Sequence, residues 1–232
     1  PCRVRATSCP SSVHSMRLRA FLMFIGAILV VATFTFPFWQ PFVQQDSAVQ
    51  EIAFPGLALD LQDDFLSLPP EQQRAYLNLQ QTEPEQALAM LTAALQPRRI
   101  APEDDEEMPE LNAPITAATG TFLTLDAIRA VRGTATIFQQ ADNTLLMRFE
   151  DFTMPNAPDA RVYLSPASEP ANTEEMLADE TAVEVGELRG AIGNQNYVLP
   201  TTVDLTLVRS VVIYSATLDL IYTYAPLFVR VG

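Results

Sequence analysis

Residues 209–227 read RSVVIYSATLDLIYTYAPL, an apolar run rich in β-branched and aromatic residues. Such residues favour a pleated, buried strand. Ser215 is a small polar residue set between two such runs, so the stretch predicts two neighbouring strands. It also raises the question of whether Ser215 takes part in any reaction.

The same strand pattern extends from Gly120 onward, where the hydrophobic periodicity is two. Residues 134–152, TATIFQQADNTLLMRFEDF, predict a hairpin with its turn at Ala141, Asp142 and Asn143. Further strands are predicted in ARVYLSP, VEVGEL, NYVLP, LVRSVVIYS, TLDLIYTY and LFVRV. Short strands without interleaved helices predict an all-β antiparallel sandwich or barrel-like domain over residues 118–232.

The segment 55–97 has a helical pattern instead. Pro70 suits the first turn of one helix, while Thr82 and Glu85 have the spacing of a capping box for a second helix with Pro84 in its first turn. We expect a small helical hairpin that acts as a packing or spacer element, with a binding groove as the alternative. Residues 98–117 hold prolines and an acidic block, which predict a linker with few contacts. The acidic block is a solvated spacer or, alternatively, a loose cation-binding segment.

The amino-terminal part is apolar. After a prefix at 1–15 without a pattern, residues 16–39 read MRLRAFLMFIGAILVVATFTFPFW, with Arg17 and Arg19 ahead of an uncharged stretch. This predicts a transmembrane signal-anchor helix, followed by a linker at 40–54. The arginines predict a single-pass protein of the cytoplasmic membrane with the N-terminus inside and the later domain extracytoplasmic. The alternative is a cleaved signal peptide, which the absence of a small-x-small pattern disfavours.

Composition excludes several kinds of chemistry. The formal net charge is −14, and after residue 40 only ten arginines face 28 acidic residues, so nucleic acid is not an expected partner. The chain has no lysine, and its two cysteines and one histidine, Cys2, Cys9 and His14, all precede Met16. The rest of the chain therefore lacks the base of a serine triad, a thiol nucleophile, a Schiff-base lysine and the usual zinc or haem ligands. We expect no enzymatic activity.

Several separated motifs resemble one known family. They are FEDF at Phe149–Phe152, NAPDARVYLS at Asn156–Ser165, GNQNYVLP at Gly193–Pro200 and VVIYS ending at Ser215. In this order they resemble the DM-thirteen domain, also called the electron-transfer DM domain, over about residues 118–231. The resemblance implies a redox role carried by a cysteine that follows the aromatic residue of the last motif. The matching pair here is Tyr214 and Ser215, so serine replaces the family's cysteine.

A serine hydroxyl cannot cycle between thiolate, sulfenate and disulfide. We therefore expect Ser215 to be a small hydrogen-bonded residue on a core strand. Oxygen ligands are plentiful in nearby loops, and calcium is the one metal that such an inventory suits, although turn chemistry explains the same residues. The candidate ligands are Asp151, Asn156 and Asp159 in one loop, and Glu187, Asn194 and Asn196 in two others. We otherwise expect neither a metal nor a cofactor.

Two functions follow from these features. The first is a membrane-anchored extracytoplasmic β-domain that acts as a non-catalytic binding or assembly module for a protein or envelope partner. The alternative is an electron-transfer or redox accessory protein of the DM-thirteen type. The missing cysteine and histidine favour the first, because only tyrosine and methionine remain as redox-capable groups after Met16.

Overall fold

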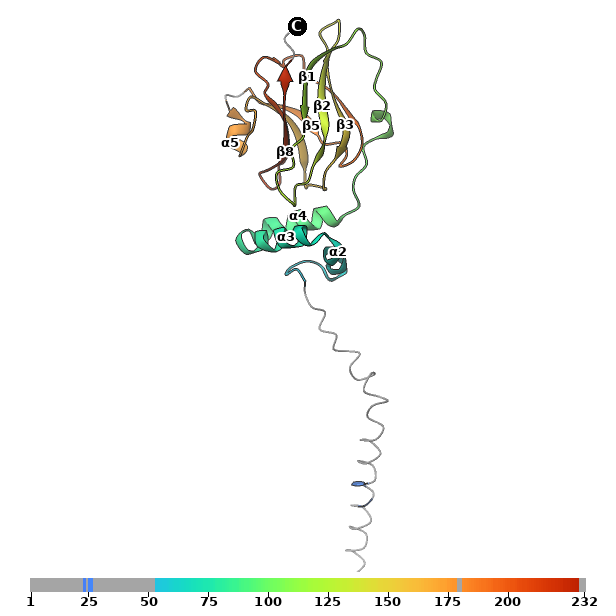
Figure 1. Cartoon of the computed structure of the whole chain (residues 1–232), viewed down its shortest axis with the longest axis vertical. Helices are drawn as coiled ribbons and strands as arrows, with labels where there is room; N and C mark the ends of the chain where they lie inside the picture. The colour runs from blue at the N-terminus through green and yellow to red at the C-terminus, as the bar shows by residue number, and fades with distance from the viewer. Residues whose placement is uncertain (1–22, 24, 27–52, 179–180, 230–232) are drawn as a thin grey trace, which may run out of the picture. The chain divides into compact units, whose positions relative to one another are not determined.

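Two antiparallel sheets stack face to face in the computed structural model, which describes residues 23, 25–26, 53–178 and 181–229 (Figure 1). The strand order is β6-β3-β2-β1-β9 in the first sheet and β5-β4-β7-β8 in the second. This confirms the predicted all-β antiparallel sandwich. The strands are β1 (Ile115–Thr121), β2 (Arg132–Gln139), β3 (Leu145–Thr153), β4 (Ala160–Ser165), β5 (Val183–Glu187), β6 (Gln195–Val198), β7 (Ser210–Ser215), β8 (Leu220–Pro226) and β9 (Phe228–Val229).

The predicted hairpin is formed by β2 and β3. Asn143 lies in the turn with φ of 65°, a left-handed conformation that asparagine tolerates better than most residues. The Asp142 carboxylate accepts a hydrogen bond of 2.9 Å from the backbone N–H of Thr144. The turn at residues 141–143 is thus confirmed, and its local hydrogen bond is the reason that this polar triplet closes the hairpin.

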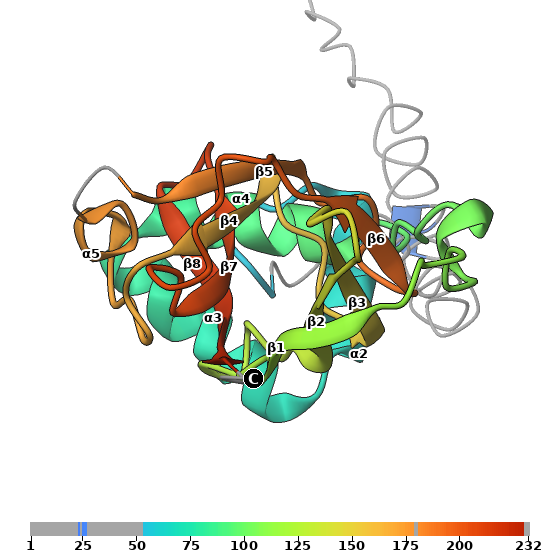
Figure 2. The same ribbon diagram turned by 90° about the horizontal axis from the view of Figure 1, so that it is seen from above.

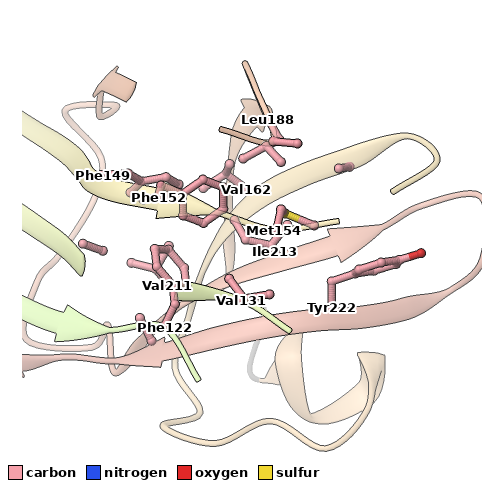
Figure 3. Packing of buried hydrophobic residues seen from close by; sticks show 14 of the residues in the cluster. Phe122, Val131, Phe149, Phe152, Met154, Val162, Leu188, Val211, Ile213 and Tyr222 are labelled. Atoms are coloured by element: carbon pink, nitrogen blue, oxygen red, sulfur yellow. The ribbon is translucent and has the colours of Figure 1, made fainter. Parts of the chain in front are cut away.

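An aromatic cluster fills the space between the sheets. The rings of Phe122, Phe149 and Phe152 lie with centroids 4.9–5.4 Å apart, and Tyr197 is 5.2 Å from Phe149. Figure 3 shows the phenylalanines beside Val162, Val211 and Ile213, which come from the opposite sheet. Each fully buried side chain of this size contributes about 1.5–3 kcal/mol. The cluster is part of the apolar core that joins the two layers.

Three helices lie across one end of the sandwich (Figures 1 and 2). They are α2 (Gln62–Ser67), α3 (Pro70–Thr82) and α4 (Pro84–Leu95), preceded by the 3-10 turn η1 (Leu59–Leu61). Buried residues of this part, including Phe65, Tyr76 and Leu91, belong to the same apolar core as the sandwich. The boundaries predicted at residues 54, 97 and 117 therefore fall within one compact unit.

The start of α4 differs from the predicted capping box. Pro84 occupies the first turn as expected, but the capping position belongs to Glu83, which makes no side-chain cap hydrogen bond. Thr82 is the last residue of α3, and its hydroxyl bonds back to the carbonyl of Leu79 at 3.2 Å. Because Thr82 is still helical, its side chain is not placed to cap the next helix, and that prediction is wrong.

The acidic segment makes more contacts than the sequence predicts for a linker. It contains the short 3-10 turn η2 (Glu103–Asp105). The buried guanidinium of Arg148 donates to the backbone carbonyls of Asp105, Glu106 and Glu107 at 2.8–3.3 Å. Arg189 donates to both carboxylate oxygens of Asp105 at 2.9 Å. Two arginines of the β domain thus hold this segment, and their pairing depends on a fold that the composition of the segment does not reveal.

The predicted prefix, most of the anchor at 16–39 and most of the linker at 40–54 lie outside the described residues. Only Met23, Ile25 and Gly26 of the anchor are described. Within the described ranges, no helix has both the length and the apolar character that crossing a membrane requires. The anchor remains a prediction from the sequence. Phe54, the last residue of the predicted linker, is fully buried in the core.

Candidate functional site

The family's redox position lies on β7, where two neighbouring residues face opposite sides of the sheet. Ser215 is fully buried, and its hydroxyl donates to the backbone carbonyl of Pro158 at 2.5 Å. Tyr214 is half-buried and belongs to a cluster on the outer face of the sheet. Alternation along a strand causes this division. The structure thus places an inert hydroxyl inside and a phenol outside.

Tyr214 donates a hydrogen bond of 2.7 Å to the carboxylate of Asp219. Asp219 ends the tight turn between β7 and β8, with φ of 49°, a conformation that aspartate adopts more readily than most residues. The short helix α5 (Thr173–Met176) supplies a second donor, because the hydroxyl of Thr173 bonds the same carboxylate oxygen at 2.5 Å. Asn172 caps this helix through the N–H of Glu175 at 2.9 Å.

These contacts shift the pKa values of both ionisable groups. Burial, followed by the hydrogen bond to Asp219, raises the pKa of the Tyr214 phenol. The hydrogen bonds from Thr173 and then from Tyr214 lower the pKa of the Asp219 carboxyl. At neutral pH the pair therefore consists of a protonated phenol and an ionised carboxylate, the arrangement that favours a charge-assisted hydrogen bond.

A second phenol and carboxylate stand beside the first. Tyr163 lies on β4, and its ring meets that of Tyr214 edge to face, with centroids 5.8 Å apart and planes at 89°. Tyr163 pairs with Val212 on β7, two residues from Tyr214, so the two tyrosines are diagonal neighbours on one face. Its hydroxyl donates to Glu184, its cross-strand partner on β5, at 2.9 Å.

Glu184 is held in turn by Arg161, whose guanidinium approaches the other carboxylate oxygen at 2.7 Å. Burial, then the hydrogen bond to Glu184, raises the pKa of Tyr163 to about 12. Arg161 first, and Tyr163 second, lower the pKa of Glu184. The second pair therefore has the same protonation pattern as the first. Met176, Val212, Ile221, Leu125 and Tyr224 pack around the two rings.

This arrangement is suited to one-electron chemistry of a phenol. An oxidised phenol is a strong acid, so it must release its proton to a nearby base. Each tyrosine here has a carboxylate already hydrogen-bonded to the proton in question. The two rings are in contact, which allows an electron to pass between them. We call Tyr163, Glu184, Tyr214 and Asp219 the tyrosine pair site.

The structure does not bring the six predicted calcium ligands together. The Asn194 amide oxygen accepts from the N–H of Asp151 at 3.1 Å, whereas Asn156 bonds the backbone at Gln96 and Pro97. Of the remaining three, Asp159 pairs with Arg161, Asn196 bonds Arg148, and Glu187 is exposed on β5. Among the residues that the structure describes, no three His, Cys, Asp or Glu side chains gather as a metal site would require.

Sequence reasoning identified Tyr214 but missed Tyr163, Glu184 and Asp219. The available signal for Tyr163 was its position in a strand, between aliphatic residues that are buried. The carboxylate partners carried no local signal, because Glu184 is opposite Tyr163 only through the strand register.

Comparison with known proteins agrees with the motif resemblance. Residues 123–227 match the family model described as "DM13: Electron transfer DM13". No curated protein and no solved structure matches the chain. Residues 123–227, which contain most of the β-sandwich, therefore match the DM13 domain, as the motifs predict.

Proposed function

We propose that this protein is a redox accessory protein of the DM13 type, in which the tyrosine pair replaces the family's thiol. The observation that carries the proposal is the hydrogen bond of 2.7 Å between Tyr214 and Asp219 at the family's redox position. The DM13 match supports this function over a purely structural one. It also favours the electron-transfer alternative over the binding module that the sequence alone favours.

The first step is the oxidation of Tyr214 by a one-electron oxidant, such as a high-potential metal centre of a partner protein. The oxidant takes one electron from the phenol, and the phenolic O–H bond breaks. The proton passes to Asp219, so the products are a neutral phenoxyl radical and a carboxylic acid. The low pKa of Asp219 does not prevent this transfer, because the oxidised phenol is far more acidic than any carboxyl group.

The second step moves the radical to the neighbouring ring. Tyr163 gives one electron to the Tyr214 radical and one proton to Glu184, while Asp219 returns its proton to Tyr214. A one-electron donor then restores Tyr163, and Glu184 returns the proton. The cycle consumes no substrate, which is consistent with an accessory protein that is not an enzyme.

The amino-terminal segment supports a membrane tether for this domain. Arg17 and Arg19 precede an uncharged stretch that ends at Trp39, a pattern typical of a single-pass anchor with its N-terminus in the cytoplasm. The proposal places the DM13 domain outside the cytoplasmic membrane, where it exchanges electrons with an envelope partner. The excess of acidic residues argues against nucleic acid as that partner.

A second candidate is a non-catalytic binding or assembly module. The observation in its favour is that Ser215 is buried and its hydroxyl bonds the carbonyl of Pro158. The residue at the position of the family's thiol therefore offers no redox-active group in this chain. The two functions differ in whether the tyrosine pair is oxidised reversibly.

The test is one-electron oxidation of the purified protein with hexachloroiridate(IV), followed by rapid freezing and electron paramagnetic resonance. We expect a tyrosyl radical that the Tyr163→Phe/Tyr214→Phe double variant loses. Tyr224→Phe is the matched control, because it removes a phenol from the same cluster and should leave the signal unchanged. Asp219→Asn should raise the potential needed for oxidation. A radical of equal yield in the double variant, or none in the unmodified protein, would leave the binding module as the function.

A further inference from the structure

A hollow lies on the five-stranded sheet, where β1 ends, β2 begins and β3 ends. The tyrosine pair site belongs to the other sheet. The volume of the hollow is about 580 Å³, within the range of small-molecule sites. Its lining includes one arginine, one aspartate, one glycine and three threonines, which are Arg132, Asp151, Gly133, Thr121, Thr134 and Thr153.

A β-bulge shapes this hollow. Gly133 on β2 faces two residues of β3, Asp151 and Phe152. The φ of Gly133 is +127°, and a Cβ atom there would lie 2.8 Å from the Cα of Phe152, so only glycine fits. Asp151 has φ of 50°, a left-handed conformation that is uncommon outside glycine, and its N–H donates to the amide oxygen of Asn194 at 3.1 Å. Bulges re-aim side chains, and both bulges and strained residues are frequent beside functional sites.

The two charged residues of the hollow are not paired. Arg132 and Asp151 are both exposed. Within the described part of the chain, neither forms an ion pair with the other or with a third residue. Glu150, which is opposite Thr134, is already held by Arg148 at 3.1 Å. The hollow therefore presents one cation and one anion to a ligand.

Threonine hydroxyls stand beside these two charges. Thr153 is directly opposite Arg132, so both side chains project from the same face of the sheet. The Thr153 hydroxyl oxygen accepts from Arg98 at 3.2 Å, and its proton remains available to donate. Thr121 and Thr134 form the next cross-strand pair. The lining thus combines uncharged hydrogen-bonding groups with one charge of each sign.

We propose that this hollow binds a free amino acid with an uncharged polar side chain. The ligand carboxylate accepts from the guanidinium of Arg132 and the hydroxyl of Thr153, and the ligand ammonium group donates to the carboxylate of Asp151. The hydroxyls of Thr121 and Thr134 suit a polar side chain. A ligand with both charges is favoured, because a simple anion is repelled by Asp151 and a simple cation by Arg132. The inference does not depend on the redox function of the tyrosine pair.

The test titrates L-serine into the isotope-labelled full chain and follows backbone amide shifts by NMR. We expect saturable shifts at Gly133, Thr134 and Asp151, which surround the hollow. L-Serinamide lacks the carboxylate and N-acetyl-L-serine lacks the ammonium group. Each should bind about five-fold more weakly than L-serine, the upper value for the loss of one exposed ion pair.

Matched variants assign each charge to its partner. Arg132→Gln should weaken the binding of L-serine about five-fold but not that of L-serinamide, which has no carboxylate to lose. Asp151→Asn should weaken L-serine to the same degree but not N-acetyl-L-serine, and asparagine tolerates the left-handed conformation that the bulge requires. Arg74→Gln and Asp63→Asn are the controls, since both remove exposed charges outside the lining, and should bind L-serine as the unmodified protein does.

Three results would overturn this site. Shifts that do not saturate, or equal affinities for the three ligands, would show that the hollow does not recognise a zwitterion. Equal weakening by Arg74→Gln or Asp63→Asn would show that net charge and not the hollow determines binding. Weaker binding of L-serinamide in Arg132→Gln would refute the pairing of Arg132 with the ligand carboxylate.

Discussion

Gly190→Ala tests how firmly the acidic segment is attached to the DM13 domain. Gly190 has an ordinary backbone conformation, so the substitution changes only the space that the residue occupies. A Cβ atom there would lie 2.6 Å from the Cα of Ala101 and against its backbone nitrogen. Real Cβ atoms do not approach backbone so closely, so the segment around Ala101 must move away.

The cost follows from the contacts that this movement breaks. The N–H of Ala101 donates to the carbonyl of Ile192 at 2.8 Å, and the N–H of Ala191 donates to the carbonyl of Arg99 at 2.6 Å. Two hydrogen bonds at about 1 kcal/mol each, together with the buried methyl of Ala101 at about 0.8 kcal/mol, give about 3 kcal/mol. We expect this loss in the free energy of unfolding measured by urea denaturation.

Gly186→Ala is the control. A Cβ atom at Gly186 meets nothing within 4 Å, and its φ of +148° leaves only backbone strain of about 1–3 kcal/mol. Trypsin gives a local measurement, because it cleaves after Arg98 and Arg99. This loss of about 2.8 kcal/mol should raise the open population, and hence cleavage in this segment, about 100-fold in Gly190→Ala. Equal cleavage rates in the two variants would refute the idea that this contact holds the segment.

Three further predictions concern other parts of the chain. Ser215→Ala should lower the free energy of unfolding, measured by urea denaturation, by about 1 kcal/mol, the value of its hydrogen bond. Ser215→Cys, in a chain starting at Met16, should react with a thiol reagent only as fast as the protein opens, because the site is buried. Because the folded pKa of Tyr163 is raised to about 12, the folded state keeps its proton longer than the unfolded state. The stabilisation that results from this raised pKa is complete below pH 10 and should disappear between about pH 10 and pH 12. Thermal unfolding across that range would detect the loss, and constant stability would contradict the prediction. Finally, cysteine in place of Ser47 should react with a membrane-impermeant reagent in intact cells; reaction only after lysis would reverse the predicted topology.

The strand pattern of this protein is local and was accessible from the sequence. Residues 209–227 form an apolar run rich in β-branched and aromatic side chains, and the structure has β7 and β8 there. The polar triplet at 141–143 closes its hairpin through contacts between residues close in the chain. The helix beginning at Pro70 was predicted for the same reason. Thr82 failed as a cap because the end of one helix and the start of the next compete for the same residue.

The acidic segment shows that residue composition alone does not predict which contacts a segment makes. Six acidic residues between 103 and 110 indicate a solvated linker if they are considered alone. Their attachment depends on Arg148 and Arg189, which are more than forty residues away along the chain. Only the fold reveals that Gly190 lies against the backbone of Ala101.

The sequence by itself determined the class of sheet, the DM13 motifs and the absence of cysteine and histidine beyond Met16, because each is a property of residue type and local spacing. Only the tertiary structure decided that Tyr214 meets Tyr163 and Asp219, that Arg132 and Asp151 line one hollow at a β-bulge, and that the helices share the core of the sandwich. These features depend on strand register and on contacts between distant segments. A shift of one residue in register would turn each side chain to the opposite face, so periodicity alone cannot specify which groups meet.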